Sequence, residues 1–236
     1  GLVTPFGVTG DTARAEVDDA VQRSVTAAAA IGLDADGVVR VDDSFPDAAI
    51  SLIAELDASM LIVAWDGPSW AADYVLGNEL DSLGRVCPVP MIAARVTRPW
   101  TRLVVRLRRP QTSWQREDVE LVGDLIGHLH GADGAPVVVL GDPDDLPEAL
   151  SGIENLDVIT SGADQAEFMT QLSPDDLLVA PAYIVHEMPP WRARRLALQI
   201  ADSNVAVVAG PHRLTLSHGV GGRPLSSMTP PITALS

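Results

Sequence analysis

The sequence predicts an α/β fold in which parallel sheets are flanked by helices. Segments typical of strands and segments typical of helices alternate along the whole chain. The strand candidates are short, unbroken apolar runs such as 60–65 and 205–209. Such runs are typical of parallel strands that helices cover on both faces of the sheet. The second half also repeats the order of the first, which indicates a duplicated unit.

The first half supplies both kinds of element. Asp11 or Thr12 provides the N-cap of a first helix, and Gly32 lies near the end of that helix. Pro46 falls in the first turn of a second helix, where its missing N–H costs little. The predicted strands are 2–6, 37–41, 60–65 and 87–96, and the predicted helices are 11–33, 46–56 and 78–86.

The second half follows the same plan. Its longest helix carries an apolar stripe formed by Val119, Val122, Leu125, Ile126 and Leu129. The predicted strands are 102–107, 136–140, 158–160, 176–180 and 205–209, and the predicted helices are 116–130, 146–150, 165–172 and 191–202. We place the boundary between the halves near 97–101, a stretch that carries Pro99 and Trp100.

The composition excludes several classes of function. The 236 residues include 32 acidic and 16 basic ones, and every basic residue is arginine, which leaves a net charge of −16. Without lysine there is no P-loop lysine and no Schiff-base lysine. The negative charge disfavours nucleic acid and anionic membranes as partners. The single cysteine, Cys87, cannot form an internal disulfide.

Residues 46–96 resemble the end of a universal stress protein (UspA-like) domain. The resemblance rests on "AAISLIAELDASMLIVAWDG", the following "LG" and "CPVPMI". It implies a five-stranded parallel sheet of the adenine nucleotide alpha hydrolase-like kind, a family that often dimerises through its last strand. In one branch the family binds ATP through Gly-x2-Gly-x9-Gly-Ser/Thr.

The resemblance implies two tandem UspA-like units. We assign 1–98 to a first unit, 99–210 to a second, degenerate unit and 211–236 to a tail rich in Gly, Pro and Ser. The first unit is expected to lack its opening strand and helix, which would lie upstream of Gly1. Tandem, degenerate units of this kind resemble the cytoplasmic C-terminal regions of bacterial cation/proton antiporters.

The candidate ligand site follows from the same motif. Gly67 fits the first glycine, Trp70 occupies the position of the second, and Gly77 with Asn78 comes three residues early in place of Gly-Ser/Thr. A βα connection that needs Gly67 and Pro68 only to turn is the alternative interpretation. The candidate ligand-binding residues are Asp66, Gly67, Ser69, Trp70, Gly77, Asn78, Arg106 and Arg108.

Arg106 and Arg108 belong to a group of six arginines between Arg95 and Arg109, interleaved with Trp100. Guanidinium groups and indole rings are good partners for phosphates and adenine rings. The alternative is that Arg102 and Arg106 share one face of a strand and pair with carboxylates.

The predicted function is a cytoplasmic regulatory domain of a membrane antiporter that senses ATP, cyclic AMP or cyclic di-AMP and forms a homodimer. The upstream partner is then the transmembrane part of the same transporter. The alternative is a structural dimerisation module whose nucleotide sites have decayed. We expect no catalytic activity and no metal site, because His128 and His130 are two residues apart on a helix and point in different directions.

Overall fold

The computed structural model describes residues 2–3, 11–39, 44–64, 78–154, 156–187 and 190–211. Within these residues, eight strands form one sheet in the order β1-β2-β3-β8-β7-β4-β5-β6. The strands are β1 (Leu2–Val3), β2 (Leu61–Ala64), β3 (Met91–Arg95), β4 (Arg102–Arg106), β5 (Val137–Leu140), β6 (Asp157–Ile159), β7 (Asp176–Pro181) and β8 (Asn204–Ala209). Neighbouring strands are parallel except β3 and β8, which confirms the predicted α/β fold.

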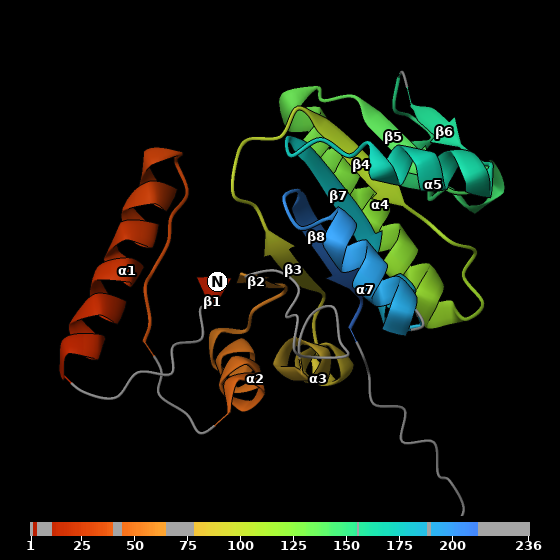
Figure 1. Cartoon of the computed structure of the whole chain (residues 1–236). Coiled ribbons are helices and arrows are strands. Elements are labelled where there is room, and N and C mark those ends of the chain that lie inside the picture. Colours follow the sequence, from red (N-terminus) through yellow and green to blue (C-terminus); the bar gives the residue numbers. More distant parts are fainter. Residues whose placement is uncertain are drawn as a thin grey trace, which may run out of the picture.

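Helices cover both faces of this sheet (Figure 1). Because side chains alternate between the faces of a strand, Val104 points to one core while Leu103 and Val105 point to the other. Helices α2, α3, α5 and α7 cover the face of Val104, and α4 covers the opposite face. The helices are α1 (Asp11–Ala30), α2 (Phe45–Leu56), α3 (Asn78–Val86), α4 (Ser113–Asp133), α5 (Gly162–Thr170), α6 (Ala182–His186) and α7 (Pro190–Gln199), with 3-10 turns η1 (Pro143–Asp145) and η2 (Glu148–Leu150).

Local signals in the sequence fix the ends of these helices. The Ser44 side chain accepts a hydrogen bond from the Asp47 N–H at the start of α2, and Thr112 caps α4 through the Gln115 N–H in the same way. Gly134 ends α4 with a φ of 64°, a left-handed conformation that glycine adopts without steric cost.

Most predicted elements are confirmed to within a few residues, two differ, and one observed helix was not predicted. The predicted strand 37–41 is not a strand over 37–39, and its other two residues lie outside the described residues. The predicted helix 146–150 appears as the short turns η1 and η2. The segment 182–186, which the sequence suggested was loop, forms α6.

The expectation of a missing opening strand and helix stays a prediction, and the position of β1 can be compared with that of β4. β1 pairs in parallel with β2, just as β4 pairs in parallel with β7. β1 therefore stands where the opening strand of the second half stands, and α1 follows it as α4 follows β4. Among the described residues, the strand positions without a counterpart in the first half are those of β5 and β6.

The two halves meet at the antiparallel pair of β3 and β8. Five residues pair in register, from Met91 with Ala209 to Arg95 with Val205. Arg95 Nη2 also donates a hydrogen bond of 2.7 Å to the Ser203 carbonyl. Each of these strands has a sheet neighbour on both sides, so neither edge is open to a second copy of the chain.

Helix α1 stands apart from the sheet in Figure 1. On the sheet face that α4 covers in the second half, Ile62 of β2 remains 41% exposed. Within the described residues, no helix is long and apolar enough to cross a membrane.

Candidate anion site at the carboxyl end of the central strands

The carboxyl ends of β4 and β7 form the position where α/β sheets most often bind ligands. From β4 the chain runs through α4 to β5 on one side, whereas from β7 it runs through α7 to β8 on the other. The crevice outside such a switch point is the usual ligand site of an open parallel sheet. Arg106 ends β4 at this crevice, and Arg108 follows two residues later.

Arg106 is half-buried, and its side chain makes no hydrogen bond or ion pair with any residue that the structure describes. Burial lowers the pKa of its guanidinium, and the positive charge of Arg192 in the first turn of α7 lowers this pKa further. The charge of Arg192 is thus near enough to act on Arg106, and it lies at the start of a helix whose dipole adds further positive potential. The arrangement favours a bound anion.

Arg102 provides the contrast on the same strand face. Its Nε and Nη2 donate to Oδ1 and Oδ2 of Asp176 at 2.8 and 2.7 Å, and Asp176 is only 1% exposed. The guanidinium also lies 5.0 Å from the ring centroid of Phe168. The prediction that Arg102 pairs with a carboxylate is confirmed. Arg106 has no such pair among the residues that the structure describes, and the charge that acts on its pKa is that of Arg192.

Arg108 belongs to a hydrogen-bonded network. Its Nη2 contacts Oε2 of Glu187 at 2.8 Å, and Gln115 of α4 donates to the other oxygen of the same carboxylate. The backbone carbonyl of Arg108 accepts a hydrogen bond from the Tyr183 hydroxyl. A ligand that used the Arg108 guanidinium would therefore compete with Glu187.

Helix α6 fills the crevice between the two cores. Ala182 and Val185 are buried in the core beneath α7, whereas Tyr183 and Ile184 are buried in the core beneath α4. Burial raises the pKa of Tyr183 to about 12. The space that a ligand's base or sugar would need between the sheet ends is thus occupied by the chain's own side chains.

The candidate residues of the first half do not share this site. Asp66, Gly67, Ser69, Trp70 and Gly77 lie outside the described residues, and Asn78 is the first residue of α3. Because β2 runs antiparallel to β4 across the sheet, these two strands point their carboxyl ends to opposite edges. The predicted ligand set therefore divides into two candidate sites.

Arg192 was not among the candidate residues predicted from the sequence, because a charge on a helix usually lies on a solvated face. Its side chain is exposed, so the burial pattern alone agrees with that interpretation. The sequence feature that could have indicated a role for Arg192 is its position in the first turn of a helix that follows a parallel strand. A cation there opposes the helix dipole, so another interaction must compensate for it.

No group of side chains able to hold a metal ion is found in the part of the chain that the structure describes. The Nδ1 atoms of His128 and His130 instead contact the carbonyl oxygens of Asp124 and Ala135, at 2.7 and 2.8 Å. Asp142 accepts a hydrogen bond from the Asp144 N–H and so caps η1.

Comparisons with known proteins agree with this architecture. The fold is similar to a universal stress protein from Archaeoglobus fulgidus DSM 4304 (TM-score 0.50, 14% identity, 89% of this chain and 83% of that chain). It is also similar to a putative universal stress protein from Pseudomonas aeruginosa UCBPP-PA14 (TM-score 0.52, 17% identity, 87% and 80%). A functionally unknown protein from Pseudomonas aeruginosa PAO1 gives a TM-score of 0.52 at 15% identity, over 89% and 91%.

No family model and no curated protein matches the sequence. The structural likeness shows that the chain has a universal-stress-protein-like α/β fold. At these identities it shows the fold alone, because one fold carries many functions.

Proposed function

We propose that the chain is a regulatory module that binds an adenine nucleotide. Its setting, by the resemblance of the sequence, is the cytoplasmic part of a bacterial cation/proton antiporter. The module would act without catalysis, by binding the nucleotide more tightly in one of two arrangements and so shifting their populations. ATP, cyclic AMP and cyclic di-AMP are the candidate ligands.

The observation that carries this proposal is the burial of Arg106 without a carboxylate partner among the described residues. A guanidinium that is half-buried, has its pKa lowered by burial and by the charge of a second arginine, and has no carboxylate partner among the described residues would be stabilised by a bound anion. Phosphate suits it, since a guanidinium can offer two parallel N–H donors to two phosphate oxygens. In this proposal Arg106 and Arg192 hold a phosphate group, and Arg108 joins them if it leaves Glu187.

The loop of the first half provides the second proposed contact. The family motif assigns Gly67, Trp70, Gly77 and Asn78 to it, and Asp66 and Ser69 are candidates beside them in the sequence. Backbone N–H groups at Gly77 and Asn78 would face an anion at the start of α3, a helix of nine residues. This second site would lie at the opposite edge of the sheet from Arg106.

A structural module without a ligand is the second candidate function, and α6 favours it. The buried side chains of Tyr183 and Ile184 occupy the crevice at the switch point. The internal pairing of β3 with β8 also replaces the contact through which such domains often dimerise, as the resemblance implies. A homodimer of this chain, which we also propose, must then use another surface.

Isothermal titration calorimetry tests the choice. ATP, AMP, cyclic AMP and cyclic di-AMP are titrated into the purified chain and into Arg106→Gln, Gly77→Trp and a control, Arg98→Gln. Arg98 is exposed, so the control removes one charge away from the site. We expect one nucleotide to bind and Arg106→Gln to weaken it about tenfold, the usual effect of losing one charge-assisted hydrogen bond.

Each outcome distinguishes the two candidate functions. A loss confined to Arg106→Gln assigns the ligand to the second half, and a loss confined to Gly77→Trp assigns it to the first. Equal weakening by Arg98→Gln would mean that only overall charge matters, which contradicts the assignment. Absence of heat with every nucleotide would leave the structural module as the better account.

A further inference from the structure

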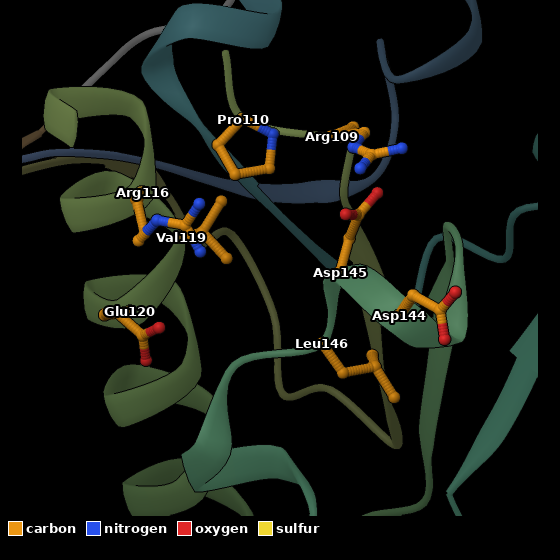
Figure 2. A pocket seen from close by; sticks show the side chains of 8 residues that line it. All are labelled: Arg109, Pro110, Arg116, Val119, Glu120, Asp144, Asp145 and Leu146. Carbon is orange, nitrogen blue, oxygen red and sulfur yellow. The ribbon is translucent and has the colours of Figure 1, made fainter. Parts of the chain in front are cut away.

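A small hollow opens beside the start of α4, separate from Arg106. It lies between α4, the segment that follows β4 and the η1 turn, as Figure 2 shows. Its volume is about 180 Å³. A buried water needs roughly 10–15 Å³ on this measure, so the hollow has room for about a dozen waters or an organic molecule of similar size.

Apolar side chains form part of the lining of this hollow. Val119 belongs to the core beneath α4 and is almost fully buried, and Leu146 packs against the same core. Pro110 lies on the opposite side of the hollow from Leu146 (Figure 2). The apolar part of the lining is small, because Val119 is only 3% exposed, and polar atoms form most of the surface of the hollow.

Charges of both signs surround this apolar surface. Arg109 and Arg116 contribute two cations, and Glu120, Asp144 and Asp145 contribute three anions. None of these five side chains makes a hydrogen bond or an ion pair with any residue in the described ranges. The opposite charges thus line a common space instead of pairing across it, and their sum, two positive and three negative, is −1.

We propose that this hollow binds a free amino acid in its zwitterionic form and prefers basic amino acids. The α-carboxylate would lie between the guanidinium groups of Arg109 and Arg116, which donate paired N–H bonds. The α-ammonium group would face the η1 carboxylates of Asp144 and Asp145. A second cation at the end of the ligand side chain would face Glu120, with the methylene chain beside Pro110 and Leu146.

Charge balance supports the preference for basic ligands. Free arginine or lysine carries a net charge of +1, which neutralises the −1 of the lining. Glutamate carries the opposite net charge and would place its second carboxylate among three acidic side chains. The hollow shares no residue with the proposed nucleotide contacts. The test of amino-acid binding is therefore independent of the nucleotide-sensing proposal.

Titration of the ¹⁵N-labelled full chain, followed by two-dimensional NMR, tests the proposal. The probes are L-arginine, L-lysine, L-glutamate and agmatine, which is arginine without its carboxylate. We expect L-arginine and L-lysine to shift the amide signals of residues 109–120 and 142–146 at millimolar concentration. Agmatine and L-glutamate are expected to bind at least tenfold more weakly.

Single-charge variants locate the contacts. Arg116→Gln and Asp145→Asn should each weaken L-arginine about tenfold, whereas Glu148→Gln, an exposed charge just outside the hollow, should leave binding unchanged. Equal binding of agmatine and L-arginine would show simple attraction of cations to an acidic chain and would overturn the proposal. So would shifts elsewhere in the chain, or no shift with any probe.

Discussion

The alkaline stability of the protein is expected to depend on Tyr183. This side chain is 0% exposed, and its hydroxyl donates to the Arg108 carbonyl. Burial is the main reason that its pKa rises from 10.0 to about 12. A pKa that is higher in the folded state means that this stability is fully present below pH 10 and is lost as the pH rises towards 12.

The size of the effect follows from this difference. Two pKa units correspond to about 2.7 kcal/mol once both states are ionised, and to about 1.4 kcal/mol at pH 11. Few side chains titrate near this range, which makes the measurement favourable. The chain has no lysine, only two tyrosines, Tyr74 and Tyr183, and one cysteine. The pKa of Cys87 is also raised by burial, and its contribution cancels when two variants are compared.

The assay is urea unfolding of the wild type and of Tyr183→Phe at a series of pH values from 8 to 11. At pH 8 the variant should be less stable by about 1 kcal/mol, the worth of one hydrogen bond. At pH 11 this difference should vanish or reverse, because phenylalanine does not ionise. A Tyr183→Phe protein that loses the same stability between pH 8 and pH 11 as the wild type would refute the reasoning.

Four further substitutions test the packing of α4, the buried ion pair and the cap of α2. A Cβ added at Gly123 of α4 would lie 2.7 Å from Pro147, so Gly123→Ala should cost about 1–3 kcal/mol in chemical denaturation. A Cβ added at Gly127 would meet nothing within 4 Å, so Gly127→Ala should stabilise the protein by up to about 1 kcal/mol in the same assay. Asp176→Ala should cost about 2–4 kcal/mol in the same assay, and loss of less than about 1 kcal/mol would show that the pair with Arg102 contributes little. Ser44→Ala should lower the thermal midpoint slightly, through about 1 kcal/mol of lost capping, and an unchanged midpoint would contradict the cap at α2.

The sequence predicted the fold because its strands are apolar on both faces and its helices carry clear end signals. Val137–Leu140 and Asn204–Ala209 are buried along their whole length, as unbroken apolar runs indicate. The segment 182–186 was not recognised as helix, since a five-residue helix is too short to display a period. Its helical form depends on burial between two cores, which is a tertiary effect.

The candidate site was predictable only in part. The even spacing of Arg102 and Arg106 correctly placed both on one strand face. The sequence could not tell that Asp176 lies beside the first and Arg192 near the second, because these partners come from elements more than 70 residues away. The charges of the α4 hollow likewise come from two separate segments, 109–120 and 144–145, and come together only in the fold.

The antiparallel pair of β3 and β8 has a mechanical consequence. A parallel block on each side is joined by a continuous hydrogen-bonded ladder, so sliding of one block along the other would break several backbone hydrogen bonds at once. Arg95 and Asn204 fasten one end of this ladder, through bonds to Ser203 and to the Thr97 N–H. The twist between neighbouring strands varies over a range, so a change in twist can leave this ladder intact. A disturbance at one edge of the sheet would therefore reach the other edge as a rotation about the β3–β8 pair. The outer surfaces of the two parallel blocks would then turn in opposite senses.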